Sequence, residues 1–451
     1  MPPDDNFAQT SILFEAGENL DFLASKLQAV LSPSHAAPGK ILVACQPGQK
    51  HKLIGKFGAI LSKFEIVEVH SLRDDLLSRV TTPFLAYLPA AASYSVPPLE
   101  RLEKGAPFLM PWIPPVTLSE NEWARLVYMA FGWICSKDLL QPLLGREMSL
   151  TLSGIERVAR ESKVSLPYFS APAGPADGGR KISQTSPPII SSQSKVMALV
   201  PHFQCEAWLE QCLDSLVRQT RPPDRILVLD DASPEPPIDI IKKFNQVTLV
   251  RSAQNVGPYR LVQSAIEQTK FDAYLFQDAD DWSSLDRLER QLQTAENTGA
   301  EWIGTQELMY FDDTLHAARY PLVVNPALKA AIRNSFCYPS SLISRELVLR
   351  LGGFSSGLRF SGDFEFLTRA VWAGKVVNLD RYAYFRRVRK NSLITSEATG
   401  LASFARQKVD FLVLKRIGEN LVRETQGLPP LLDPLQKTGP IALEHLAGPV
   451  L

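Results

Sequence analysis

The chain has 451 residues, 45% of them hydrophobic and 21% charged, which is the composition of a folded globular protein. At about 150 residues per domain, this length predicts two or three domains. Lysine plus arginine and aspartate plus glutamate both number 48, so the chain lacks the basic excess of proteins that bind nucleic-acid backbones.

Cysteine usage and the apolar runs bear on the cellular compartment. The five cysteines are scattered without a C-x-x-C pair, which argues against a disulfide framework and a structural zinc site and favours a reducing compartment. The N-terminal MPPDDNFAQT lacks a signal-peptide pattern, and the longest apolar run, 126–135, is far shorter than the about 20 residues that cross a bilayer. We expect a soluble cytoplasmic protein without a transmembrane segment, and peripheral contact with a membrane stays open.

The first predicted domain covers residues 1–170. Apolar runs at 40–46, 64–69 and 84–89 predict strands with helices between them. We therefore expect an α/β domain, whose role these patterns do not define. The following segment, 171–194, is rich in proline, glycine and serine and predicts a linker.

The second predicted domain covers residues 195–425, and a proline-rich stretch at 426–451 predicts a loosely attached tail. Strands are predicted at 195–200, 225–230, 247–251 and 272–276. The helical spacing between them favours a mostly parallel sheet with crossover helices. Since ligands bind such sheets beyond the carboxyl ends of the strands, we expect 201–203, 230–233 and 277–281 to form one mouth.

The strongest local signal is the acidic cluster after the fourth of these strands, Asp278-Ala279-Asp280-Asp281. Three neighbouring carboxylates repel one another unless a positive charge lies between them. A divalent cation such as Mg²⁺ or Mn²⁺ prefers oxygen ligands of this kind and also binds phosphate oxygens. A solvated acidic turn is the structural alternative.

A second acidic pair, Asp230-Asp231, ends the 225–230 strand. These carboxylates are placed to accept hydrogen bonds from a base N–H or a ribose hydroxyl. The structural alternative is a helix N-cap cluster in which Asp231 or Ser233 satisfies free backbone N–H groups.

The next loop, 255–260, opens a helix through Gly257 and Pro258. Its functional interpretation is close backbone approach to a nucleotide at Asn255 and Gly257, with Tyr259 or Arg260 contacting the base or the phosphates. A plain loop-to-helix turn is the alternative.

Together these features resemble the family 2 glycosyltransferases, which have the GT-A fold. The similarity begins at 200–233 (VPHFQ…LDDAS), continues through the Asn-x-Gly loop and the Asp-Ala-Asp-Asp motif, and resumes at 335–375 (SFCYPSS…VWAGK). The family's acceptor-side Glu-Asp signature reads Gly362-Asp363 here. The resemblance covers roughly residues 195–395, and the motifs come in the family's order.

The resemblance implies a Rossmann-like, mostly parallel GT-A catalytic domain that binds a nucleotide sugar, with a UDP-sugar favoured. It implies that Asp280 and Asp278 hold a divalent Mn²⁺ or Mg²⁺ ion and that Asp363 is the catalytic base that deprotonates the acceptor hydroxyl. The residues expected at the donor are Pro201, His202, Asp230, Asp231, Asn255, Gly257, Tyr259, Arg260 and Asp278. The expected reaction is inverting transfer to a glycan, lipid-linked or protein acceptor in surface polysaccharide or glycoconjugate synthesis.

Two positions depart from the family pattern. Gly362 replaces the first carboxylate of the Glu-Asp pair. Arg389 occupies the place of a histidine that can bind the metal in relatives. An arginine cannot ligate a metal, but it can pair with the diphosphate directly.

Residues 82–113 echo the strand and acidic loop of the second domain, with residues 89–92 in place of the acidic ones. The first domain is therefore either a second, degenerate GT-A-like unit or a chance match of two strand-turn-helix units. The rival functions are a non-catalytic nucleotide- or glycan-binding module and a nucleotidyltransferase. The latter is disfavoured because Pro201-His202-Phe203-Gln204 replaces the Gly-rich basic loop that such enzymes carry after the first strand.

Overall fold

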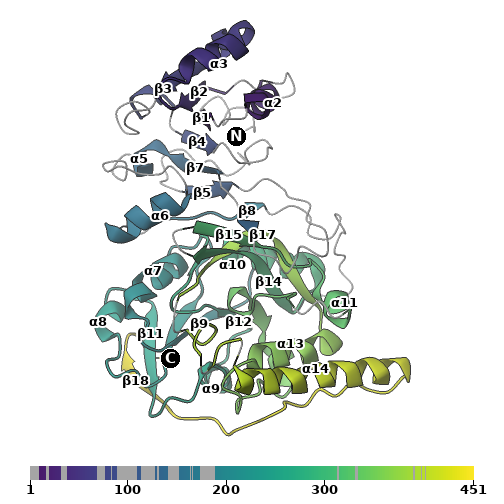
Figure 1. The fold of residues 1–451 in the computed structure, drawn as a ribbon. Coiled ribbons are helices and arrows are strands. Elements are labelled where there is room, and N and C mark those ends of the chain that lie inside the picture. Colours follow the sequence, from purple (N-terminus) through teal and green to yellow (C-terminus); the bar gives the residue numbers. More distant parts are fainter. Residues whose placement is uncertain are drawn as a thin grey trace. The chain divides into compact units, whose positions relative to one another are not determined.

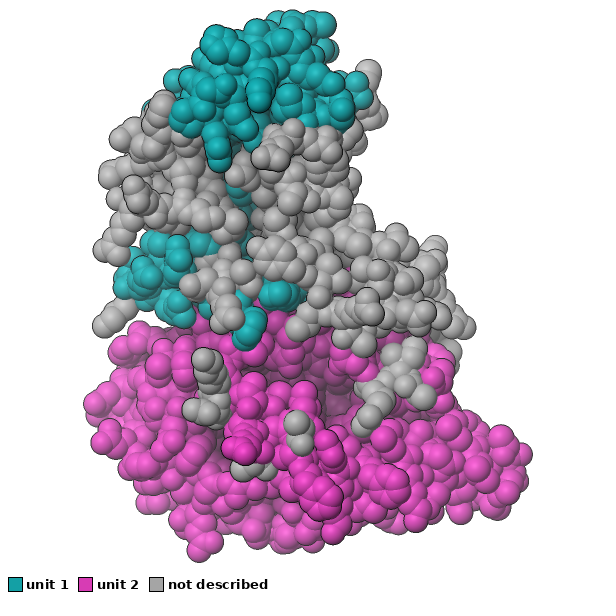
Figure 2. All heavy atoms as spheres, viewed as in Figure 1, with its two compact units in different colours: residues 1–117, 126–174, 310–317 teal, residues 118–125, 175–309, 318–451 magenta. Residues whose placement is uncertain are grey.

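The computed structural model divides into two compact units, coloured separately in Figure 2. Unit 1 comprises residues 1–117, 126–174 and 310–317, and unit 2 comprises residues 118–125, 175–309 and 318–451. The structure describes residues 10–16, 20–31, 38–68, 77–82, 84–88, 109–112, 127–128, 132–140, 152–162, 164, 166–172, 188–311, 314–330, 334–389, 392–397, 399–401 and 403–450. The middle of the expected linker, 173–187, lies outside the described residues.

Unit 2 is built on a long mixed sheet (Figure 1). Its strands, in spatial order, are β13 (Trp282–Ser283), β17 (Val376–Arg387), β14 (Trp302–Phe311), β16 (Leu342–Ser344), β12 (Ala273–Phe276), β9 (Val196–His202), β10 (Arg225–Asp230), β11 (Val247–Ser252) and β18 (Leu443–Ala447). The central strands β12, β9, β10 and β11 are parallel, and β16 and β18 join them antiparallel. The parallel arrangement predicted from the alternating pattern is confirmed.

Helices cover both faces of this sheet. They are α7 (Glu206–Val217), α8 (Ile238–Ile241), α9 (Pro258–Gln268), α10 (Arg287–Thr298), α11 (Val324–Lys329), α12 (Arg345–Arg350), α13 (Gly362–Ala373) and α14 (Phe404–Thr425), with a 3₁₀ turn η4 (Tyr338–Ser340). None of the helices within the described ranges is both long enough and apolar enough to cross a membrane.

Two hydrophobic cores follow from the two-residue period of the strands. In β9, Met197 and Leu199 face a core with α9, α12 and α13. Their neighbours Ala198 and Val200 face the opposite core with α7 and α10. Because both faces are covered, the central strands read as continuous apolar runs, which is why the sequence pattern located them well.

The C-terminal stretch differs from the expected loose tail. β18 pairs antiparallel with β11 and extends the sheet, and the Thr248 hydroxyl donates to the carbonyl of Pro449 at 2.7 Å. Between α14 and β18, the amide of Leu435 donates to the buried carboxylate of Glu365 at 3.1 Å. α14 ends at Thr425, and Gly427, with φ +69°, turns the chain out of the helix. The proline-containing segment that follows stays attached because its backbone pairs at the sheet edge.

Unit 1 contains a smaller sheet of the order β3-β2-β1-β4-β7-β5. The strands of this sheet are β1 (Thr10–Glu15), β2 (Lys40–Cys45), β3 (Glu65–Glu68), β4 (Phe84–Leu88), β5 (Leu109–Trp112) and β7 (Gly132–Ser136). Three short strands lie outside it, namely β6 (Val127–Tyr128), β8 (Ala171–Pro172) and β15 (Thr314–Ala318), the last of which pairs with β6. The helices of unit 1 are α2 (Leu20–Val30), α3 (Lys50–Phe57), α5 (Lys137–Leu140) and α6 (Leu152–Glu161), with 3₁₀ turns η1 (Gly58–Lys63) and η2 (Leu77–Arg79).

The two sheets have the same strand topology. In unit 1, β3, β2, β1 and β4 are parallel, β7 joins β4 antiparallel, and β5 joins β7 antiparallel. In unit 2, β11, β10, β9 and β12 are parallel, β16 joins β12 antiparallel, and β14 joins β16 antiparallel. Each sheet thus places its first four strands in the order third, second, first, fourth. Unit 1 is thus the second α/β domain that the sequence predicts in addition to the domain of residues 195–425.

Candidate functional site

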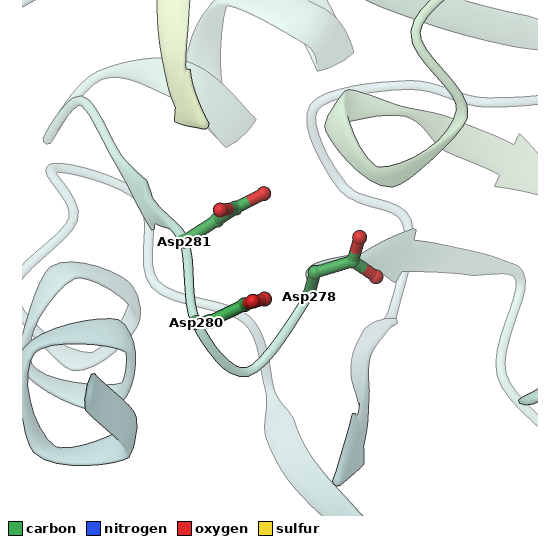
Figure 3. Close-up of side chains that lie close together, drawn as sticks. All are labelled: Asp278, Asp280 and Asp281. Atoms are coloured by element: carbon green, nitrogen blue, oxygen red, sulfur yellow. The ribbon is translucent and has the colours of Figure 1, made fainter. Parts of the chain in front are cut away.

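The acidic loop follows β12 and runs directly into β13. One carboxylate oxygen from each of Asp278, Asp280 and Asp281 lies within 4.8 Å of the others. Figure 3 shows the three side chains projecting from this single turn. The loop is therefore a dense negative site at the carboxyl end of a central strand, as the sequence pattern predicted.

Asp281 fastens this loop to β17. Its two carboxylate oxygens accept hydrogen bonds from the Tyr384 hydroxyl and from the backbone N–H of Arg387, each at 2.7 Å. Burial raises the pKa of Asp281 well above its usual value, and the charges of Asp280 and Asp278 raise it further. With both oxygens engaged, Asp281 holds the turn in shape and leaves the two other carboxylates as ligand candidates.

Asp280 carries an ion pair with Arg389. The Nε of Arg389 lies 2.5 Å from Oδ2 of Asp280, and its guanidinium stacks over the ring of Trp208 at 5.0 Å. Burial tends to lower the pKa of Arg389, but the charge of Asp280 and their hydrogen bond raise it above its usual value. A fixed positive charge therefore lies at the position for which the family resemblance implied a metal-binding histidine.

Asp278 is the least compensated of the three carboxylates. Burial raises its pKa to about 7, with further increases from the charges of Asp280 and Asp363, while Arg386 and Arg389 oppose them. A cation at Asp278 would relieve this repulsion. Since Asp278 and Asp280 offer closely spaced carboxylate oxygens, they fit a hard divalent ion such as Mn²⁺ or Mg²⁺.

Asp363 lies in the first turn of α13, where the helix dipole favours a carboxylate. The hydroxyl of Tyr259 donates a hydrogen bond to its Oδ1 at 2.8 Å. Because the charge of Asp363 raises the pKa of Asp278, the two carboxylates interact across the same region of the site. Residues far apart in the chain, on the β12 loop and α13, are thus brought together.

Asp230 and His202 form a buried pair rather than an open donor surface. They are register partners on β10 and β9, and Nδ1 of His202 lies 3.0 Å from Oδ1 of Asp230. The other oxygen of Asp230 accepts from the backbone N–H of Ser233 at 3.1 Å. Nε2 of His202 accepts from the Cys205 N–H at 3.3 Å, which assigns the ring proton to Nδ1 and makes it the donor to Asp230.

Asp231 shapes the 255–257 loop. Its carboxylate accepts from the backbone N–H groups of Val256 at 2.7 Å and Gly257 at 2.9 Å. Burial raises the pKa of Asp231, and these hydrogen bonds partly offset the increase. Gly257 has φ +89°, a left-handed conformation that favours glycine and that lets Pro258 begin α9.

The remaining predicted donor residues have different placements. Asn255 donates to the carbonyl of Asp231 at 3.1 Å and is itself contacted by Arg359. Pro201 is half-buried near the end of β9. Arg260 donates to the carbonyl of Gly439 at 3.0 Å, so its side chain binds the C-terminal segment rather than the acidic loop.

Sequence reasoning missed several side chains of β17 and α7. The Tyr384 hydroxyl and the Arg387 backbone N–H donate hydrogen bonds to Asp281 in the acidic turn. The charge of Arg386 lowers the pKa of Asp278. The guanidinium of Arg389 packs over the ring of Trp208. The Tyr384–Asp281 contact joins residues 103 positions apart. No local motif marks such a contact, and only the strand pairing of β13 with β17 reveals it.

The family model described as glycosyl transferase family 2 matches residues 197–346, which include the acidic loop and the Asp230–Asp231 pair. The matched segment lies mostly within unit 2, which is similar to the family 2 glycosyltransferases over these residues. The parallel central strands confirm the mostly parallel α/β class expected for this part of the chain.

Curated relatives that match this part of the chain carry glycosyltransferase names. The chain is 27% identical over 189 residues to glycosyltransferase AglE of Haloferax volcanii, covering 40% of this chain and 62% of the relative. It is 32% identical over 103 residues to the poly(ribitol-phosphate) beta-glucosyltransferase of Bacillus spizizenii, covering 21% of this chain and 16% of the relative. The chain thus spans less than two thirds of the length of these relatives.

Solved structures of glycosyltransferases also match. The S. aureus TarS 1–349 complex with UDP-GlcNAc has a TM-score of 0.41 and 16% identity, covering 50% of this chain and 66% of that chain. The mannosyltransferase PcManGT of Pyrobaculum calidifontis, in complex with GDP-Man and Mn²⁺, has a TM-score of 0.37 and 17% identity, covering 47% and 62%.

Proposed function

We propose that this chain is an inverting glycosyltransferase that moves a sugar from a nucleotide-diphosphate sugar to an acceptor hydroxyl. The observation that carries the proposal is the set of carboxylates Asp278, Asp280 and Asp363, which interact electrostatically in one site of a family 2 domain. Such a set suits the transfer of a sugar from a diphosphate oxygen to an acceptor hydroxyl oxygen. The diphosphate oxygen must gain negative charge, and the hydroxyl oxygen must lose a proton.

On the donor side, Asp278 and Asp280 would hold the divalent ion, which when bound stabilises the negative charge that develops on the leaving diphosphate. Arg389, charged and adjacent to Asp280, is placed to add a hydrogen-bonding cation for the same oxygens. Asp281 keeps the turn rigid through Tyr384, so the carboxylates of Asp278 and Asp280 stay in position as charge builds.

On the acceptor side, Asp363 would accept the proton of the incoming hydroxyl. Its hydrogen bond from Tyr259 orients one oxygen, which leaves the other for the acceptor. Attack from the side opposite the diphosphate inverts the anomeric centre, and no covalent sugar–enzyme intermediate is required.

The nucleotide would lie over the carboxyl ends of β9 and β10, near Pro201 and the loop that Asp231 organises. Asp230 and His202 would support this surface from below, since both are buried. We propose a UDP-sugar as donor and a polysaccharide or glycoconjugate as acceptor. The similarity to a poly(ribitol-phosphate) beta-glucosyltransferase favours a polymeric acceptor.

The test is a thermal-shift and turnover panel with UDP, GDP, CDP, dTDP, UDP-glucose, UDP-GlcNAc and GDP-mannose, each with and without Mn²⁺. A ligand that binds only the native state raises its melting temperature. We expect one nucleotide class to stabilise the protein in a Mn²⁺-dependent way and its sugar conjugate to be hydrolysed slowly to the nucleoside diphosphate.

The Asp280→Ala variant should lose both the Mn²⁺-dependent shift and turnover. Asp239→Ala is the matched control, because Asp239 is an exposed carboxylate paired only at the surface with Lys242. Binding of a nucleotide without turnover of any sugar donor in the panel would favour the rival, a non-catalytic binding module. A flat panel in both measurements would contradict the proposal.

A further inference from the structure

The place of the missing carboxylate at position 362 is filled by an aromatic ring. A Cβ added to Gly362 would lie 2.7, 2.8 and 3.0 Å from three ring atoms of Tyr259. Real Cβ atoms hardly ever approach other atoms so closely. A glutamate at position 362, as in the family signature, therefore cannot coexist with Tyr259 in its observed place.

Tyr259 uses this position to reach the neighbouring residue. Its hydroxyl donates to Oδ1 of Asp363 at 2.8 Å, and its side chain is almost fully buried, with 8% exposure. The ring also contacts the edge of Tyr338, with ring centroids 6.5 Å apart.

The backbone of Tyr259 is held as firmly as its side chain. It is the second residue of α9, which begins at Pro258 directly after Gly257. The hydrogen bonds from the Val256 and Gly257 amides to Asp231 fix the loop immediately before it. The hydroxyl is thus delivered to Asp363 from a rigid helix start, and the orientation of the carboxylate follows from it.

We propose that Tyr259 is the positioning residue for Asp363 and replaces the carboxylate that precedes the base in relatives, with Gly362 making room for its ring. This inference rests on the proposed function, because it assigns Tyr259 its role through Asp363.

The replacement has an electrostatic reason. Asp280 and Asp363 each already repel the carboxylate of Asp278. A glutamate at position 362 would add another negative charge there, whereas a phenol donates a hydrogen bond to the charged form of Asp363 and adds none. Tyr259 therefore orients the base at lower electrostatic cost than a glutamate would.

Tyr259→Phe removes only the hydroxyl and is the first test. We expect kcat for turnover of the preferred donor of the panel to fall by about 10- to 100-fold, the range for losing a hydrogen bond to a charged group. The KM for the donor and the thermal shift with its nucleotide and Mn²⁺ should stay unchanged. The matched control is Tyr274→Phe, since Tyr274 belongs to the same core and its hydroxyl pairs with Thr269 away from the acidic site.

The second test places a glutamate at position 362 and removes the ring at position 259. Gly362→Glu alone should lose activity, because the ring of Tyr259 occupies the space that the new side chain needs. The double variant Gly362→Glu with Tyr259→Ala should be more active than either Gly362→Glu or Tyr259→Ala alone, since it rebuilds the family pair. A double variant no better than the two single variants would overturn the proposal.

Asp363→Asn distinguishes failure of this inference from failure of the proposed function. If Asp363→Asn stops turnover while Tyr259→Phe keeps kcat within twofold of wild type, the positioning role is wrong and the base assignment stands. If Asp363→Asn turns over donor at the wild-type rate, the base assignment fails and the role of Tyr259 fails with it.

Discussion

Units 1 and 2 share one strand topology but end their strands in different chemistry. In unit 2, β10 ends in Asp230 and continues to Asp231, and β12 runs into Asp278 and Asp280. In unit 1, β2 ends in Cys45, and β4 is followed in the sequence by Pro89-Ala90-Ala91-Ala92, which lie outside the described residues. The shared strand order thus provides a crevice, and the side chains at its edge determine whether it can hold a diphosphate and a cation.

One strand-end carboxylate of unit 1 has a structural task. Glu68, at the end of β3, accepts a hydrogen bond from the backbone N–H of Gly48 at 3.0 Å in the loop after β2. Gly48 has φ +84°, so this loop takes a left-handed turn that the carboxylate stabilises. This contrast supports the proposal that unit 2 holds the catalytic site.

The largest expected effect is on kcat, and it compares the proposed base of unit 2, Asp363, with Glu68 at a strand end of unit 1. Asp363→Asn should reduce kcat by about 10³-fold, within the 10²- to 10⁴-fold contribution of general base catalysis, and leave the thermal shift with nucleotide and Mn²⁺ intact. Glu68→Gln should keep kcat within about twofold, because its loss affects only a loop turn. A larger loss of kcat in Glu68→Gln than in Asp363→Asn would break the comparison.

The second effect concerns the ion pair that anchors α13 beneath the base. Arg369 donates to both oxygens of Glu365 at 2.9 and 2.8 Å, and both side chains are fully buried. Glu365→Gln leaves the arginine charge uncompensated, so unit 2 should lose about 3 kcal/mol of stability. Since about 1 kcal/mol corresponds to 2–4 °C at this size, the melting temperature should fall by roughly 6–12 °C.

Calorimetry of the same variant tests the independence of the two units. We expect the transition of unit 2 to move and that of unit 1 to stay. Glu346→Gln is the control, since Glu346 makes only an exposed pair with Arg350 on α12. If Glu365→Gln and Glu346→Gln shift the melting temperature equally, the buried pair is not an anchor.

The regular part of unit 2 could be predicted from the sequence. β10 was predicted with its observed bounds, and β9, β11 and β12 within one or two residues at each end. These strands are buried on both faces, so continuous apolar runs mark them without ambiguity. The rule that ligand residues follow parallel strands then located the acidic turn.

The side-chain partners could not be predicted in the same way. His202 and Asp230 were expected at the donor, but their register pairing buries them against each other. The sequence predicts that Tyr259 contacts the nucleobase or the phosphates of the donor. In the structure its hydroxyl donates a hydrogen bond to Asp363, 104 residues further along the chain. Such contacts depend on how distant helices pack, which local periodicity does not encode.

A smaller effect is the pH dependence of metal binding. Burial and neighbouring charges raise the pKa of Asp278 to about 7, so at pH 5.5 its carboxyl must lose a proton before it binds a cation. Mn²⁺ affinity should therefore be measurably weaker at pH 5.5 than at pH 8. Thermal shifts with saturating nucleotide and a Mn²⁺ titration at both pH values measure this.

In the metal-free protein, a rise in pH makes Asp278 lower the stability of the fold, whereas in the presence of Mn²⁺ it strengthens metal binding. The folded pKa of Asp278 lies above the unfolded value of about 3.9, so its contribution to stability is present at low pH and is lost as the pH rises through 7. Asp278→Asn should remove this pH dependence and raise the metal-free melting temperature at pH 8. A Mn²⁺ affinity equal at both pH values would show that Asp278 is not a ligand.

The central claim is that one of two topologically matching units holds the nucleotide and the metal. Isothermal titration of the full chain with UDP in the presence of Mn²⁺ tests it most directly, with GDP as the alternative titrant if the thermal panel selects guanine. The account predicts one nucleotide per chain and no binding in Asp280→Ala. Two nucleotides per chain, or one that Asp280→Ala still binds with wild-type affinity, would contradict it.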